Sequence, residues 1–299
     1  MSGMLGAARA GLFGVLVVLL AGPAPAQTPD PAALASQERA AVEASVRDGF
    51  ASTLIASLAR DGALLWPGAP VVVGAEQARR LLNAQRGLDS LRVTWQPLGL
   101  ELAADGTLGV TWGVAAAARD GAAARLGRYI AAWRPEGEAW KLAAFVVIGL
   151  SPPTATTLPA ELGPARRPPI SPSGPAGPFV AADLAFARLA ADSGAARAFL
   201  RFAAPDAVTF GGVGLLHRGP EAIGRALDDG AVTRWDWHPV LAGASASGEL
   251  GFTVGEAEIR PEGAPVNYSK YLTIWRRQPG GEVRFLTDGG NARPATPAP

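Results

Sequence analysis

The second half of this 299-residue chain repeats the first half at a constant offset of 142 residues. Three blocks match without a gap: Trp95–Leu98 with Trp237–Val240, Gly106–Gly113 with Gly248–Gly255, and Tyr129–Arg134 with Tyr271–Arg276. A period of this length is far too long for a solenoid and suits two copies of one domain. We therefore expect two similar domains, spanning residues 36–150 and 179–291.

Residues 1–26 have the pattern of an export signal. Arg9 precedes the apolar run Gly11–Ala21, and Ala24-Pro25-Ala26 offers the small residues that a signal peptidase recognises. The run has about half of the roughly 20 residues that a membrane-spanning helix needs. No cysteine follows it, which excludes a lipid-anchored lipoprotein. The alternative is a short anchor that is never cleaved. We predict cleavage before Gln27 and a periplasmic or secreted protein with no membrane attachment.

Charge and composition narrow the classes of partner. Without residues 1–26 the chain carries 26 basic and 26 acidic residues, so its net charge is zero. A balanced chain lacks the electrostatic footprint that binding to nucleic acid or anionic lipid needs. The chain has no cysteine, and its two histidines, His217 and His238, stand apart from any cluster of carboxylates. We expect no metal site and, because no glycine-rich nucleotide motif is present, no cofactor.

Three segments are predicted to lie outside the packed domains. Residues 151–178 contain nine prolines, each of which removes a backbone donor and fixes φ, so an extended linker is expected. Residues 27–35 and the tail 292–299 are expected to be loose.

Each copy has helices first and strands after. In copy two, apolar spacing predicts a helical region with a break at Ser193-Gly194, and Gly219-Pro220-Glu221 predicts the start of a short helix. The expected segments are helix 180–202, a short strand 207–210, the helix from 220, and strands 233–242, 250–260, 266–278 and 282–288. This order indicates an α+β fold with a curved antiparallel sheet wrapped around the helices, which makes a cone with an apolar interior.

The element order and four segments together resemble the nuclear-transport-factor-2-like superfamily. The segments are Ala204–Val208, His217–Ile223, Ser247–Gly255 and Tyr271–Arg277. This superfamily includes ketosteroid isomerase, scytalone dehydratase and the SnoaL-like polyketide cyclases, and the chain is most similar to its bacterial branch of uncharacterised function. The resemblance covers both copies, is clearer in the second, and implies two cystatin-like cones.

The resemblance also implies that the two copies pair through their sheets, as an intramolecular pseudo-dimer. Trp95 and Trp237 are candidates for that contact, because exposed tryptophans are otherwise costly. The fold hosts many chemistries and many plain binders, so it implies no particular activity. In ketosteroid isomerase the proton-shuttling aspartate lies on the short strand inside the cone. The matching position is Phe210 here and Trp66 in copy one, and neither ring can accept a proton.

Copy two supplies the other candidate residues. His217 with Asp206 can form a general base, or His217 satisfies nearby backbone groups. Asp288 is either an acid in a pocket or a cap at the end of the last strand. Tyr271 and Trp275 repeat as aromatic residues in copy one, which indicates core packing or, with Phe210, the wall of a ligand pocket.

One strand of copy two alternates polar and aromatic residues. Arg234, Asp236 and His238 share one face, and Trp235 and Trp237 share the other. We interpret the polar face as solvent-exposed; a His238–Asp236 dyad is the alternative.

Three classes of function remain open. The first is an exported domain that binds a small apolar ligand in the copy-two cone without converting it. The second is a lyase, isomerase or hydrolase acting on a small carbonyl or polyketide-like compound, with Asp206, His217, Tyr271 and Asp288 converging in the cone. The third is a structural or interaction module with no pocket.

Overall fold

The computed structural model describes residues 30–85, 87–88, 90–119, 123–149, 174–210, 216–228 and 233–295. The predicted signal segment, the linker up to residue 173 and the last four residues lie outside the described residues. Within the described ranges, no helix is long and apolar enough to cross a membrane. In the same ranges, no group of three or more His, Cys, Asp or Glu side chains is placed to hold a metal ion.

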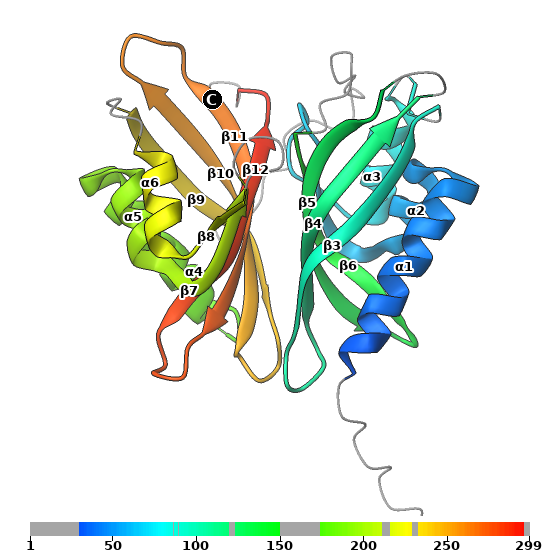
Figure 1. Ribbon diagram of the computed structural model, residues 1–299, viewed down its shortest axis with the longest axis horizontal. Helices are drawn as coiled ribbons and strands as arrows, with labels where there is room; N and C mark the ends of the chain where they lie inside the picture. The colour runs from blue at the N-terminus through cyan, green and yellow to red at the C-terminus, as the bar shows by residue number, and fades with distance from the viewer. Residues whose placement is uncertain are drawn as a thin grey trace, which may run out of the picture.

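Each half of the chain folds into a six-stranded sheet with three helices (Figure 1). Domain one consists of α1 (Pro31–Asp48), α2 (Phe50–Ser57), β1 (Leu58–Leu65), β2 (Val72–Val73), α3 (Ala75–Asn83), β3 (Arg92–Leu102), β4 (Gly109–Ala118), β5 (Arg125–Glu136) and β6 (Ala139–Ile148). Domain two consists of α4 (Gly177–Ser193), α5 (Ala195–Phe202), β7 (Ala203–Phe210), β8 (Leu216–Arg218), α6 (Pro220–Leu227), β9 (Thr233–Ala244), β10 (Leu250–Pro261), β11 (Asn267–Arg277) and β12 (Val283–Ala292).

The two sheets have the same topology. Their strand orders are β2-β1-β6-β5-β4-β3 and β8-β7-β12-β11-β10-β9. In each sheet the first long strand runs parallel to the last one, and every other pairing is antiparallel. The α+β class and the tandem arrangement predicted from the sequence are confirmed.

Two helices begin earlier than predicted. α1 starts at Pro31, because the Asp30 side chain accepts a hydrogen bond from Ala32 N (2.8 Å) and proline suits the first helical turn. The prediction that residues 31–35 are loose is therefore wrong. α4 starts at Gly177, inside the predicted linker. The predicted break between α4 and α5 is confirmed at Gly194, whose φ of 85° ends the helix.

The last strand extends further than predicted. β12 continues to Ala292, so Asp288 lies in mid-strand, and the interpretation of Asp288 as a strand-end cap is wrong. From the sequence, the Gly289-Gly290 pair predicts the end of the strand. In the structure Gly290 meets the backbone of Lys270 so closely that no side chain fits there, and β11 continues to pair with β12 beyond it.

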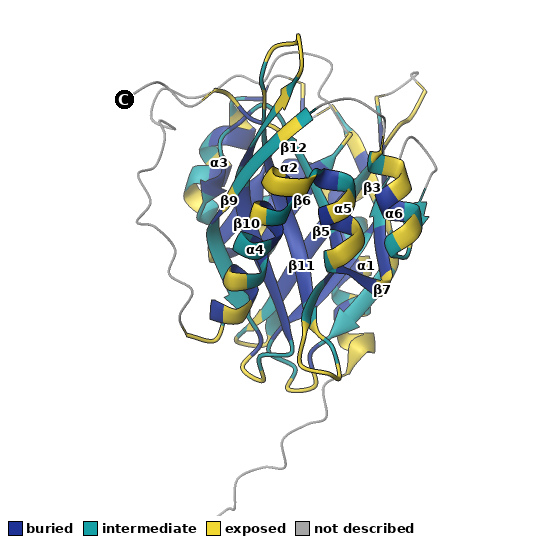
Figure 2. Cartoon of the chain, turned by 90° about the vertical axis from the view of Figure 1, so that its left-hand side faces the viewer, coloured by how far each residue is buried: buried dark blue, intermediate teal, exposed yellow. Residues whose placement is uncertain are grey.

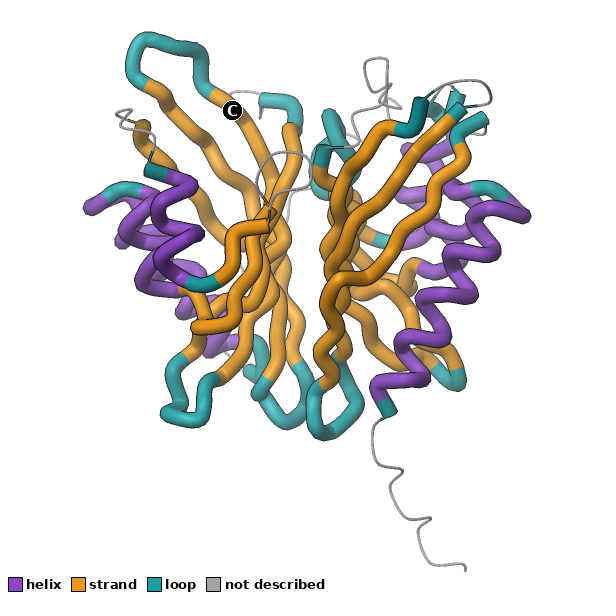
Figure 3. The backbone as a smooth tube through the Cα atoms, viewed as in Figure 1, coloured by secondary structure: helices purple, strands orange, loops and turns teal. Residues whose placement is uncertain are grey.

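The two domains pack sheet against sheet, with the helices on the outside (Figure 3). Alternate residues of β5 show this directly. Tyr129 and Trp133 belong to the apolar cluster under the domain-one helices, whereas Ile130 belongs to a cluster that includes Leu272 and Ile274 of domain two. The middle parts of the central strands β5, β6 and β11 are accordingly buried on both faces, while each helix keeps one exposed face (Figure 2). Paired domains are what the resemblance implies.

Trp95 and Trp237 do not lie in this interface. The Trp95 ring packs edge-on against Phe50 of α2 at 6.2 Å, and the Trp237 ring lies 4.8 Å from Phe186 of α4. Both rings therefore face the helices of their own domain, and their predicted role in the domain contact is wrong. The helices bury these tryptophans, so no second domain is needed to cover them.

A short polar network also ties the domains together. The Asn291 side chain donates to Leu65 O (2.8 Å) and Val147 O (2.7 Å) of domain one, and it accepts a hydrogen bond from Lys270 Nζ (2.5 Å). Next to it, Gly68 N donates to Ala292 O (2.8 Å). One side chain thus satisfies two buried carbonyl groups and a buried ammonium group at once.

We expect Asn291→Ala to destabilise the protein by about 2–5 kcal/mol, because it leaves two buried carbonyls without this donor and removes one of the two acceptors of the buried Lys270 ammonium. Asn267→Ala is the control, since Asn267 lies exposed on the neighbouring strand. Chemical denaturation of both variants is the measurement. Equal stability of the two variants would refute a locking role for Asn291.

Candidate functional site

Both domains contain the same buried hydrogen-bond network between the first helix and the sheet. In domain one, Glu38 of α1 accepts hydrogen bonds from Tyr129 Oη (2.6 Å) and Thr111 Oγ1 (3.0 Å). Trp133 Nε1 donates to the same threonine (2.9 Å). Glu38 is fully buried, and burial raises the pKa of its carboxyl above the usual value.

In domain two, Asp183 of α4 takes the place of Glu38. It accepts hydrogen bonds from Tyr271 Oη (3.0 Å) and Trp237 Nε1 (2.9 Å), while Trp275 Nε1 donates to Thr253 (2.8 Å). Burial raises the pKa of Asp183 to about 6, against the lowering effect of these hydrogen bonds, and raises that of Tyr271 well above its usual value. Because the network occurs in both domains, we assign it to holding helix against sheet.

Sequence comparison at the fixed offset of 142 misses this pair. Glu38 and Asp183 each lie eleven residues before the glycine that separates the first two helices, Gly49 or Gly194. Their own offset is 145, because the two domains differ in length between the helices and the central strands. An alignment that matches Gly49 with Gly194 also matches Glu38 with Asp183.

The cone of domain two is hollow. A cavity of about 790 Å³ opens between its helices and sheet. The pocket under α1 and α2 of domain one, lined by Glu38, Tyr129 and Phe145 among others, has about 10 Å³. Aromatic rings line much of the cavity: Phe186, Phe199, Phe210, Trp235 and Trp237. Tyr271 also contributes, and Ile148 of domain one completes the wall. Trp275 does not reach the cavity; it is fully buried behind it, so its predicted place in the pocket wall is wrong.

A row of polar residues crosses the sheet on the cavity side. Strand pairing places Thr209 beside His217, Asp288 beside Thr209 and Thr273 beside Asp288. All four residues line the cavity. The row continues to Thr253 of the buried network, which pairs with Thr273.

The same row in domain one is apolar. By the same pairings it consists of Val72, Leu64, Phe145 and Ala131. The Phe145 ring stacks on Tyr129 with its centroid 6.1 Å away, which fills the centre of that cone. Asp288 occupies the position of this ring in domain two. All four positions of the row thus differ between the domains, and the polar row lines the cavity of domain two.

Asp288 is the ionisable group at the centre of the row. Thr273 Oγ1 donates to its Oδ2 atom at 2.5 Å, and among the described residues no donor reaches Oδ1. Burial raises the pKa of Asp288 to about 7; the Thr273 hydrogen bond lowers it, and the charge of nearby Asp183 raises it. The group can therefore give or take a proton near neutral pH, and part of its surface faces the cavity.

Phe210 lies at the edge of this site. It pairs with Leu216, and its counterpart by strand register is Leu65, so the sequence alignment with Trp66 is off by one residue. The Phe210 ring lines the cavity and packs under the guanidinium group of Arg128 from domain one, 5.7 Å from the ring centre.

Asp206 does not join the site. Its side chain is 62% exposed and pairs with Arg276 on the surface, so the predicted convergence of Asp206 with His217 is wrong. Asp206 lies three residues before Thr209 on β7, and side chains an odd number of residues apart face opposite sides of a strand. Thr209 therefore faces the cone and Asp206 faces away from it.

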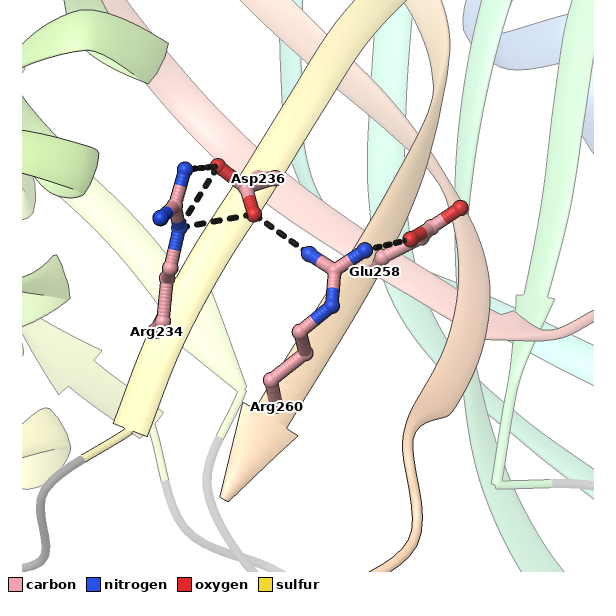
Figure 4. A network of polar contacts seen from close by, with 4 residues as sticks. All are labelled: Arg234, Asp236, Glu258 and Arg260. Atoms are coloured by element: carbon pink, nitrogen blue, oxygen red, sulfur yellow. Dashed lines mark hydrogen bonds and ion pairs between the residues drawn. The ribbon is translucent and has the colours of Figure 1, made fainter. Parts of the chain in front are cut away.

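The polar face of β9 is solvent-exposed, as predicted. Asp236 forms ion pairs with Arg234 (3.0 Å) and with Arg260 of β10 (2.5 Å), and Arg260 also pairs with Glu258 (Figure 4). Asp236 is thereby committed to arginine partners, and His238 lies exposed. The alternative of a His238–Asp236 dyad is not supported.

Lys270 is a residue that the sequence analysis did not single out. Its ammonium group is buried at the rim of the cavity, where it donates to Asn291 Oδ1 and to Ala292 O (2.8 Å). Burial lowers its pKa to about 7, against the raising effect of Glu256. The sequence gives no reason to expect a buried lysine here, because its partner Asn291 lies beyond residue 288, where the last strand is predicted to end.

No protein-family model and no curated protein matches the chain. Solved structures that are similar include a ketosteroid isomerase-like protein from Erwinia carotovora, 15% identical, with a TM-score of 0.34 over 41% of this chain and 97% of that one. An NTF2-like protein with a cystatin-like fold from Novosphingobium aromaticivorans is 16% identical, with a TM-score of 0.32 over 38% and 79% of the two chains. A domain of unknown function with a cystatin-like fold from Nostoc punctiforme is 14% identical, with a TM-score of 0.33 over 39% and 76%.

These structures are of the kind that the sequence resemblance names. Each match covers about two fifths of the chain. The likeness concerns fold alone, and the description of the two domains rests on their own strand order and pairing. The chain is a tandem pair of α+β cones, similar in fold to NTF2-like and ketosteroid isomerase-like proteins.

The raised pKa of Asp288 predicts how stability depends on pH. The folded state keeps a proton that the unfolded chain has lost between pH 3.8 and about 7. The resulting stabilisation is complete below that range and is lost as the pH rises through about 7. Relative to Asp288→Asn, the wild type should therefore lose stability between about pH 4 and pH 8.

Denaturation midpoints across this pH range are the measurement. Asp192→Asn, at an exposed carboxyl near the end of α4, controls for the loss of a surface charge. A difference between wild type and Asp288→Asn that stays constant with pH would contradict the buried position of Asp288.

Proposed function

We propose that domain two binds a small, mostly apolar molecule in its cone, and that domain one is a closed partner domain. The contrast between two cones of the same topology carries this proposal. The cone of domain two holds a cavity of about 790 Å³, and the pocket under α1 and α2 of domain one has about 10 Å³. Ligand sites of drug-like molecules have volumes of about 300–1,000 Å³, with apolar walls and a few polar groups.

The walls of the cavity support an aromatic or other apolar ligand body. Trp235, Trp237, Phe186 and Phe199 form a chain of edge-on contacts with centroid distances between 4.7 and 6.5 Å. Such surfaces bury large apolar area at little cost in side-chain entropy. The third class of function, a module with a filled core, fits domain one and not domain two.

A second candidate function is catalysis of proton transfer on the bound molecule. Asp288 favours it, because a carboxyl group with a pKa of about 7 inside an apolar cavity can act as a general acid or base. His217 lies in the same row and lines the same cavity. The substrate would be a small carbonyl or polyketide-like compound, as the resemblance implies.

We expect Asp288→Phe, which restores the residue type of domain one, to occupy the polar centre of the cavity and to weaken binding. Binding is followed by quenching of tryptophan fluorescence with apolar aromatic probes, since Trp235 and Trp237 line the cavity. Asp236→Thr is the control: it removes a carboxylate from the outer face of β9, where exposed ion pairs contribute about 0–1 kcal/mol. A folded Asp288→Phe protein that binds the probes like the wild type would place the ligand site elsewhere.

We also propose that the protein is exported. Residues 1–26 carry the pattern of a cleavable signal, and the described residues contain no helix able to cross a membrane. Mature protein from the native host should begin at Gln27 and fractionate with the periplasm or the medium. N-terminal sequencing that finds Met1 retained in a membrane fraction would overturn the proposal.

A further inference from the structure

Around Asp288 three side-chain donors are already engaged, and the Thr209 hydroxyl and the His217 ring are the donors of the polar row that remain. Thr273 donates its hydroxyl proton to Asp288, while Tyr271 and Trp237 donate theirs to Asp183. What remains at the centre of the polar row is Asp288 Oδ1, which accepts no hydrogen bond from the described residues. A ligand that reaches this point gains most by bringing a donor of its own.

The charges near Asp288 are acidic. Asp183 on α4 and the phenol of Tyr271 on β11 lie close enough to interact with it electrostatically. His217 on β8 lies two positions along the row. No arginine or lysine among the described residues pairs with Asp288 or Asp183. These two carboxyl groups therefore lack a counter-charge.

The cations of the cavity lie at its rim and are already engaged. Lys270 Nζ donates to Asn291 and Ala292, and Arg293 lies 3.6 Å from Glu256 and donates to Ser269 O (3.1 Å). Along β11, Ser269 lies four positions and Lys270 three positions from Thr273, the partner of Asp288. At about 3.3 Å per residue the rim is roughly 10–13 Å from Asp288.

Trp235 and Trp237 line the cavity on the rim side of Asp288, since they lie level with Asn267 and Ser269 in the strand register. Phe186 and Phe199 pack against Phe285 on its other side. The faces of tryptophan and phenylalanine rings carry negative partial charge and attract cations within about 6 Å. A protonated amine would meet these faces on its way to Asp288, and desolvation strengthens such contacts. An anionic ligand would instead meet the two acidic groups, Asp288 and Asp183.

We propose that the ligand of domain two is a hydrophobic amine, whose apolar body fills the aromatic part of the cavity and whose ammonium group pairs with Asp288. This inference rests on the proposed function and specifies its ligand class. It assigns Asp288 the role of the ligand's counter-ion and Thr273 the role of holding the Asp288 carboxyl group in place.

Calorimetric titration of the full chain with three matched probes tests the inference: naphthylmethylamine, naphthylmethanol and naphthoate, at about pH 8. The amine should bind at least about tenfold more tightly than the alcohol, as expected for a hydrogen bond to a charged group, and the carboxylate should bind most weakly. Asp288→Asn should reduce the affinity for the amine to that for the alcohol. Asp206→Asn, at an exposed carboxylate, should leave the preference intact.

The outcomes separate the two proposals. If the alcohol binds and the amine has no advantage, or if the preference survives in Asp288→Asn, the cavity binds ligands but the amine inference is wrong. If none of the three probes binds to the wild type, the proposed ligand-binding function falls together with it. Thermal unfolding of Asp288→Asn confirms that a lost preference reflects the site and not a loss of fold.

Discussion

The structure depends on burying the apolar convex faces of the two strongly curved sheets against each other. The helices cover the concave face, and the convex face is too apolar to be left in water. Ile130 of domain one and Ile274 of domain two belong to one apolar cluster because each sheet covers the other. A tandem duplication supplies the second sheet at fixed stoichiometry. Because the convex faces are packed together, the cone of domain two keeps its fold although it encloses a cavity.

The two domains have diverged in how they fill their cones. Both keep the buried carboxyl group that receives a tyrosine hydroxyl, Glu38 or Asp183, and both keep the tryptophan that donates to a threonine. They differ at the centre of the sheet, where Phe145 of domain one corresponds to Asp288 of domain two. What the domains share holds helix to sheet, and what only domain two has lines a cavity. Duplication within one chain thus provides its own comparison between structural and functional residues.

The sequence predicted the fold better than the site. Periodicity, the break at Gly194 and the repeated strands gave the α+β order, because these signals are local. The membership of the site depends on which face of a strand a residue occupies and on which strand lies beside it. Asp206 and Thr209 belong to the same strand, yet only Thr209 enters the cone. Asp183 was missed because it comes from a helix whose spacing to the sheet differs between the domains. The continuation of β12 was not predicted, because two consecutive glycines usually mark the end of a strand. Here Gly290 allows the close approach of the Lys270 backbone.

The central claim is that domain two is a ligand-binding cone, and native mass spectrometry of the full chain purified from its host tests it most directly. We predict a retained small molecule, bound one to a chain, that is depleted in the Asp288→Phe variant purified in the same way. A chain that carries no ligand and shows no mass shift with any apolar probe would contradict it.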